Sequence, residues 1–117
     1  GLRYHGMAPL VSHIYELGLV EAISIPQTEC FEGALQFARA EGIVPAPEPT
    51  HAIAAAVREA LACKESGEEK VILTALCGHG HLDLASYETF LSGQMVDLDL
   101  PDSAIQEAME NVPKIEG

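Results

Sequence analysis

The sequence has 117 residues, which is the size of one small domain. Hydrophobic residues make up 48% and aromatic residues 5%, so the core has to be aliphatic, which suits Ala-rich helices packed on a sheet. The formal net charge of -12 leaves no basic footprint for DNA or RNA, and no apolar stretch approaches the roughly 18 residues that cross a bilayer.

The first third of the chain predicts a helix, a strand and a second helix. Residues 7–17 carry apolar side chains at helical spacing, and the glycine that follows them is typical of a helix end. Residues 19–25 are few and rich in branched side chains, which predicts a strand. Thr28 is a suitable N-cap for a second helix that ends at Gly42. The predicted buried face of that helix consists of Phe31, Ala34, Leu35 and Ala38.

The middle of the chain predicts a loop, a helix and a second strand. Three prolines fall in residues 41–49, and because proline fixes φ and lacks an N–H we expect a rigid extended loop there. Thr50 then caps a third helix that ends near Gly67. Residues 70–76 form a continuous apolar run, typical of a strand buried on both faces of a parallel sheet. The predicted buried face of the third helix consists of Ile53, Val57, Ala60 and Leu61.

Two further helices are predicted beyond that run. One covers residues 84–91, and the other follows Pro101, where Ser103 and Gln106 match a capping box. The alternation of helices and strands indicates an α/β fold with few parallel strands flanked by helices. Two strands make a poor sheet, and the chain opens on GLRYHGMAP without an initiator Met, so we expect it to be a piece of a longer protein.

The sequence CGHGH, residues 77–81, follows the second predicted strand directly. Ligands of open parallel sheets gather at such carboxyl ends, and the two glycines allow the backbone to approach a ligand closely. An ordinary tight turn between strand and helix has the same composition. A third interpretation is a zinc site, because Cys77, His79 and His81 alternate and could share one face, with His51 as a further ligand.

Glu48 lies between two prolines just before the predicted third helix. A carboxylate on a rigid loop is held in place at little entropic cost, which suits a group that acts on a bound substrate. The alternative is an acid that is exposed to water and caps the helix, because a helix N-terminus favours an anion.

The cysteines indicate a reducing compartment. Cys30, Cys63 and Cys77 are odd in number and have no CxxC spacing, so a disulfide framework is not expected. No charged and then apolar leader opens the sequence. We therefore expect a soluble, cytoplasmic protein.

Three motifs in this order resemble the tryptophan synthase β chain family: GLRYHGMAP at the start, EGIVPAPEPTHA over residues 41–52 and CGHGHLD over residues 77–83. The similarity is greatest to the divergent second type of β chain. The matched motifs lie in residues 1–83, and residues 84–117 are expected to form a helical C-terminal extension. Together, residues 1–117 are expected to be the C-terminal part of one catalytic domain. The resemblance implies the C-terminal part of a type II pyridoxal-phosphate enzyme, which makes L-tryptophan and water from L-serine and indole.

The resemblance also implies site residues. Cys77 stands where the family usually has a serine that hydrogen-bonds the pyridine nitrogen of the cofactor, and Gly78 lines the same turn. Glu48 stands where a carboxylate assists the addition of indole. Backbone carbonyls around Tyr4 and Gly6 match a stretch that binds a monovalent cation. A thiol or hydroxyl, with a pKa of about 8.5 or higher, cannot keep the ring nitrogen protonated as a carboxylate would, and this suits β-replacement.

The chain departs from the family in residues that bear on the site. Cys77 replaces the usual serine, and a thiol is a weaker hydrogen-bond partner. Arg3 replaces an acidic residue of the main β-chain type, and His79 replaces an arginine of that type. The family's Schiff-base lysine, phosphate loop and communication domain precede the matched region, and the three lysines of this chain lie in none of those contexts. We therefore expect the chain alone to be inactive.

The resemblance implies partners for the longer protein as well. It should be a homodimer, with a weak contact to an α subunit. Other functions stay open: a serine or threonine deaminase of the same fold type, a binding domain without catalysis, or the small metal-binding protein described above.

Overall fold

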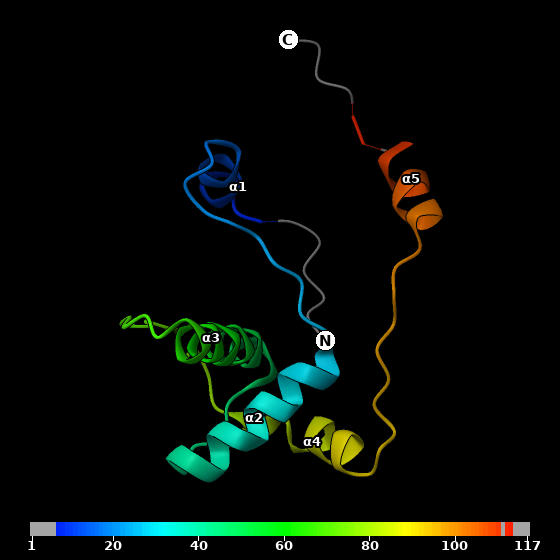
Figure 1. Cartoon of the computed structure of the whole chain (residues 1–117). Helices are drawn as coiled ribbons and strands as arrows, with labels where there is room; N and C mark the ends of the chain where they lie inside the picture. The colour runs from blue at the N-terminus through cyan, green and yellow to red at the C-terminus, as the bar shows by residue number, and fades with distance from the viewer. Residues whose placement is uncertain (1–6, 111, 114–117) are drawn as a thin grey trace.

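The computed structural model describes residues 7–110 and 112–113, and the secondary structure of these residues is helical (Figure 1). All five predicted helices are confirmed. In chain order the elements are α1 (Pro9–Glu16), α2 (Gln27–Glu41), α3 (Pro47–Ser66), the 3-10 turn η1 (Gly80–Leu82), α4 (Leu84–Leu91) and α5 (Asp102–Glu110). Both long helices end at a glycine in the left-handed region, Gly42 at φ 71° and Gly67 at φ 74°, as their sequences predict.

The core lies where α2, α3 and α4 meet. Phe31 of α2 and Tyr87 of α4 are 3% and 5% exposed, and their rings meet edge to face with centroids 5.0 Å apart. Gly33 of α2 is buried, and a Cβ placed on it would lie 3.6 Å from the backbone of Ala54 in α3. This close approach of α2 and α3 is built from small residues, in keeping with the aliphatic composition. Ile53 of α3 is also buried.

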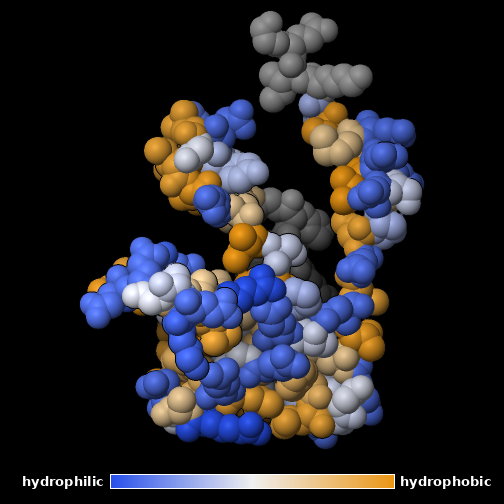
Figure 2. All heavy atoms as spheres, viewed as in Figure 1, coloured by the Kyte–Doolittle hydropathy of each residue, from blue (hydrophilic) through white to orange (hydrophobic). Residues whose placement is uncertain are grey.

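The helices α1 and α5 contribute no buried residue and lie apart from the α2–α3–α4 core (Figure 1). The radius of gyration is 17.0 Å, whereas a compact chain of this length has one of about 13 Å. Both α1 and α5 carry exposed apolar side chains, and Figure 2 shows hydrophobic surface over α1 and along the segment that leads to α5. Leu10 of α1 is 79% exposed and Met109 of α5 is 63% exposed.

Neither predicted strand is formed within the described residues. Residues 19–25 and 70–76 contain no strand, and Val71 and Leu73 are 99% and 96% exposed. The physical reason is that a strand is stabilised by a ladder of hydrogen bonds to neighbouring strands. Branched or apolar composition alone therefore does not make a sheet.

The helix α3 begins four residues earlier than predicted, with Ala46 and not Thr50 at its N-cap. The expectation of an extended loop up to Pro49 is wrong, because Pro47 and Pro49 both lie in the first helical turn. The first four N–H groups of a helix have no partner within the helix, so proline loses nothing there, and its fixed φ suits the first turn. Thr50 is therefore not the N-cap. Its hydroxyl donates to the carbonyl of Pro47 at 2.5 Å.

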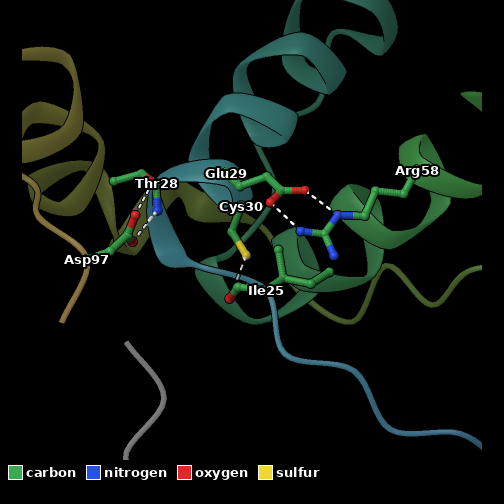
Figure 3. A network of polar contacts seen from close by, with 6 residues as sticks. All are labelled: Ile25, Thr28, Glu29, Cys30, Arg58 and Asp97. Atoms are coloured by element: carbon green, nitrogen blue, oxygen red, sulfur yellow. Dashed lines mark hydrogen bonds and ion pairs between the residues drawn. The ribbon is translucent and has the colours of Figure 1, made fainter. Parts of the chain in front are cut away.

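The N-terminus of α2 is capped by a residue far away in the sequence (Figure 3). Thr28, the predicted N-cap, lies inside the helix, and its N–H donates to the carboxylate of Asp97 at 3.0 Å. The Thr28 hydroxyl donates to the same carboxylate. Both bonds lower the pKa of Asp97, and the bond from the Thr28 hydroxyl is the larger cause. The segment after α4 is thereby attached to the start of α2.

A second polar contact joins α2 to α3 beside it (Figure 3). The Arg58 guanidinium donates two hydrogen bonds to the Glu29 carboxylate, one of them at 2.5 Å, and lowers the pKa of Glu29. Both side chains are partly exposed, so this pair fixes an orientation rather than supplying much stability. Next to it, burial raises the pKa of the Cys30 thiol.

In the part of the chain that the structure describes, no helix is long and apolar enough to cross a membrane.

Candidate functional site

The two motif segments identified in the sequence lie against each other. The N–H of Ala46 donates to the carbonyl of Gly78 at 3.0 Å, and the N–H of Gly80 donates to the carbonyl of Val44 at 2.7 Å. Between these bonds Pro45 faces His79 in an isolated antiparallel bridge. The bonds flank this pair and do not involve it, so the N–H that proline lacks is not needed there. The bridge brings together segments more than thirty residues apart.

Tyr87 of α4 completes this junction. Its hydroxyl donates to the carbonyl of Pro45 at 2.5 Å, and both residues are buried. Burial raises the pKa of Tyr87 to about 12, with the negative charge of Asp83 as a smaller cause, so the hydroxyl keeps its proton at neutral pH. The core residue Phe31 packs on the same ring. The junction of the two motif segments is thus fixed directly to the hydrophobic core.

Gly80 is required at this place for a steric reason. A Cβ on Gly80 would lie 2.5 Å from the carbonyl oxygen of Pro45, 2.9 Å from Val44 and 3.0 Å from the Tyr87 ring. At Gly78 a Cβ would meet only the side chain of Ala46, at 3.1 Å. The sequence predicts that the glycines let the backbone approach a ligand; in the structure Gly80 instead allows two backbone segments of the chain itself to lie close together.

Glu48 lies in the first turn of α3, two residues after Ala46, and its side chain is exposed. The predicted rigid loop is replaced by the start of a helix, which fixes the backbone of Glu48. The position agrees equally with the alternative of an acid that interacts with the helix N-terminus, because a negative charge is favoured there. The junction described above fixes the direction in which α3 leaves the motif segments, and with it the place of Glu48.

Cys77 precedes the junction and is exposed. It is a free thiol at the end of the extended apolar segment, where the sequence placed it. His79 and His81 are exposed as well, with ring centroids 4.7 Å apart, and the N–H of His81 donates to the ring of His79.

The zinc site considered as an alternative is not assembled in the described residues. Within residues 7–110 and 112–113, no three His, Cys, Asp or Glu side chains are arranged to hold a metal ion. His51 approaches the backbone carbonyls of Pro47 and Glu48, each at 3.3 Å, and takes no place beside Cys77. The carbonyls of Tyr4 and Gly6, expected to bind a monovalent cation, lie outside the described residues, as does Arg3.

Sequence reasoning missed Tyr87, Val44 and Ala46, which hold the two motifs together. A tyrosine in the middle of a short apolar helix is an ordinary core residue in the sequence, and nothing in the spacing of residues 84–91 points to the carbonyl of a proline 42 residues away. One signal was available: two glycines that alternate with histidines indicate a backbone packed closely against something.

Comparison with known proteins supports the family resemblance. The tryptophan synthase beta chain 2 of Aquifex aeolicus is 61% identical over 97 residues, which are 83% of this chain and 22% of that protein. The tryptophan synthase beta chain 2 of Methanosarcina acetivorans is 56% identical over 96 residues, 82% of this chain and 22% of that protein. That of Pyrococcus furiosus is 48% identical over 113 residues, 97% of this chain and 25% of that protein. No family model matches the chain.

These matches confirm the resemblance that the motifs indicated. The chain spans between a fifth and a quarter of the length of these relatives. A continuous match of 97 residues in a chain of 117 includes residues 21–97 wherever it begins. The similarity therefore covers Glu48, Cys77, Tyr87 and Asp97, and continues past the last motif residue, Asp83.

Proposed function

The chain is homologous to a segment of the tryptophan synthase β chains, and from this premise we propose that it forms part of an enzyme that makes L-tryptophan from L-serine and indole. The observation that carries the proposal is the junction of the two motif segments. In the described residues, EGIVPAPEPTHA and CGHGHLD are held together by backbone hydrogen bonds and by Tyr87. This junction supports the proposal that residues from both segments act on one bound group.

The proposed cofactor is pyridoxal phosphate, which supplies an electron sink for replacing the hydroxyl group of serine. Cys77 would hold its pyridine nitrogen, and Gly78 would line the same turn. The structure is compatible with this role in two respects. The Cys77 thiol is exposed, so it is free to meet a ligand, and Gly78 carries no side chain that would stand in the way. A neutral thiol donates or accepts a weak hydrogen bond and leaves the ring nitrogen unprotonated.

Glu48 is the proposed acid–base group. Its carboxylate would take up or give a proton as indole adds to the serine-derived carbon. A general base has to lie within hydrogen-bond reach of its proton, and α3 holds Glu48 only two residues from the bridged segment.

The chain by itself is proposed to be inactive. Pyridoxal-phosphate enzymes bind their cofactor through a lysine, and the two described lysines are poorly placed for this. Lys70 is paired with Glu59 at 2.8 Å and with Glu68 at 3.2 Å, and Lys64 lies in the last turn of α3. Mixing the purified chain with pyridoxal phosphate should give no absorbance band of a lysine-bound cofactor. Such a band would contradict this part of the proposal.

The fold of the longer enzyme is proposed to be the type II fold, with residues 19–25 and 70–76 as parallel strands. Most of their side chains are apolar and exposed, among them Val71 and Leu73, and a parallel sheet buried on both faces requires mostly apolar strands. Strands from the remainder of the enzyme would supply the hydrogen-bond ladder. We further propose that carbonyls around Tyr4 and Gly6 bind a monovalent cation there, and that the enzyme is a cytoplasmic homodimer with a weak α-subunit contact. The free cysteines are compatible with the cytoplasm.

A chimera tests the proposed function. The segment of Aquifex aeolicus tryptophan synthase beta chain 2 that matches this chain is replaced by it, and the chimera is supplied with L-serine, indole and pyridoxal phosphate. We expect L-tryptophan to form, and the variant Glu48→Gln to lose about 100-fold in kcat or more, because a general acid–base group contributes roughly 10²–10⁴-fold. Glu41→Gln, which removes an exposed carboxylate at the end of α2, is the matched control and should leave kcat unchanged.

Two results would contradict the proposal. One is a folded chimera that binds the cofactor but makes no tryptophan. The other is a chimera that turns L-serine into ammonia and a keto acid at the same rate with and without indole, which would favour the deaminase alternative.

A further inference from the structure

Tyr87 does more at the motif junction than fill the core. The ring alone would suffice for the edge-to-face contact with Phe31 and for the packing against Gly80. The hydroxyl has a separate partner, the buried carbonyl of Pro45, at 2.5 Å. A phenylalanine would keep the packing and lose this bond, so the hydroxyl can be examined by itself.

The carbonyl that Tyr87 bonds belongs to Pro45, whose own backbone groups make no hydrogen bond across the bridge. Pro45 has no N–H, and the two hydrogen bonds of the bridge are made by its neighbours Val44 and Ala46. The carbonyl of Pro45 therefore points away from the segment of residues 78–80 and into the core, where Tyr87 meets it. Leaving such a buried carbonyl without a donor is costly, so the segment would shift if the hydroxyl were removed.

A shift of Pro45 would be transmitted to Glu48. Only Ala46 and Pro47 separate them, and Pro47 has a fixed φ and starts the rigid helix α3. On the other side, the bridge connects Pro45 to His79, two residues after Cys77. Tyr87 thus acts on the junction of the two segments that carry the proposed functional side chains.

We propose that Tyr87 is a positioning residue, whose hydrogen bond to Pro45 sets the place of Glu48 relative to Cys77. The proposal rests on the proposed function for its chemical consequence, but the mechanical part can be measured without it. Tyr87 does not touch a reacting group. It acts through the segment that carries Glu48.

The first test uses the chain as it is, without cofactor. Amide hydrogen exchange is followed in the wild type, in Tyr87→Phe and in Ile53→Val, which is a control that removes one buried methylene from α3. We expect Tyr87→Phe to increase exchange at the N–H groups of Ala46 and Gly80 about tenfold more than at the amides of α3. Ile53→Val should change all of them to a similar degree. Equal protection of Ala46 and Gly80 in wild type and Tyr87→Phe would overturn the proposal.

The second test uses the chimera with the Aquifex aeolicus chain. Tyr87→Phe should lower kcat for tryptophan formation about tenfold and change KM for L-serine by less than about twofold, because misplacing a reacting group affects the chemical step most. Ile53→Val should leave kcat unchanged. Equal kcat values for Tyr87→Phe and the wild type would also overturn the proposal. A wild-type chimera that makes no tryptophan would refute the proposed function instead, and the exchange measurement would then decide the role of Tyr87.

Discussion

The substitution Gly80→Ala tests the motif junction directly. A methyl group on Gly80 would lie 2.5 Å from the carbonyl oxygen of Pro45, 2.9 Å from Val44 and 3.0 Å from the Tyr87 ring. Heavy atoms in contact lie about 3.5–4.0 Å apart, so the two segments must separate by about 1 Å. Gly80 adopts no left-handed conformation, so the cost comes from crowding and not from backbone strain.

The magnitude follows from two contributions. Forcing a methyl group into a packed core typically costs about 1–3 kcal/mol. Separating the segments also breaks the bond from the Tyr87 hydroxyl and leaves the buried Pro45 carbonyl without its donor, which costs about 1–3 kcal/mol more. We expect the free energy of unfolding to fall by about 2–6 kcal/mol. Gly78→Ala is the matched control, because its methyl group meets only the side chain of Ala46, at 3.1 Å, and should cost about 1 kcal/mol or less.

Denaturant unfolding followed by circular dichroism measures both variants. Gly80→Ala should unfold at a much lower denaturant concentration than Gly78→Ala, with the wild type highest. If both variants lose the same stability, the two segments are not packed as the structure has them, and the steric reasoning for Gly80 is refuted.

Three further predictions concern α2, its cap and Tyr87. Gly33→Ala should stabilise the chain by about 0.5–1 kcal/mol, because Gly33 lies inside α2 and its new methyl group would make ordinary contacts at 3.6 Å or more; a loss of stability in urea unfolding would contradict this. Asp97 has a lowered pKa in the folded chain, so its contribution to stability is present above about pH 4 and lost as the pH falls through the lowered pKa. In Asp97→Asn, the free energy of unfolding should fall less steeply at acidic pH than in the wild type, as measured by unfolding at a series of pH values. The same pH dependence in both proteins would refute the capping of α2 by Asp97. Tyr87 has a pKa raised to about 12, so stability from its neutral form is present below about pH 10 and lost as the pH rises towards 12. Tyr87→Phe should lack this alkaline loss, as measured by unfolding at each pH, and an identical loss in the variant would count against the burial of the phenol.

The sequence predicted what depends on neighbours along the chain and missed what depends on distant contacts. The five helices follow from apolar spacing and from stop residues such as Gly42 and Gly67, which act within one or two turns. The start of α2 was mispredicted because its capping group, Asp97, is 69 residues away from Thr28. No local rule contains such a partner.

The predicted sheet illustrates the same limit. Residues 19–25 and 70–76 have the composition of buried strands, yet strands exist only in pairs, and the partners are not supplied by the described residues. Prolines at positions 47 and 49 predict a loop, but proline is equally suited to a first helical turn, which is where the structure has them. Only part of the candidate site could be predicted from the sequence. Glu48 and Cys77 came from motifs, whereas Tyr87, which joins the two motif segments, could be found only in the fold.

The central claim is that the two motif segments form one side of a cofactor site. A crystal structure of the chimera with bound pyridoxal phosphate tests it most directly. We predict that the sulfur of Cys77 lies within hydrogen-bond distance of the pyridine nitrogen, with the Glu48 carboxylate facing the same cofactor and Tyr87 still bonded to Pro45. A pyridine nitrogen bonded to another residue, with Cys77 turned away from the ring, would contradict the claim.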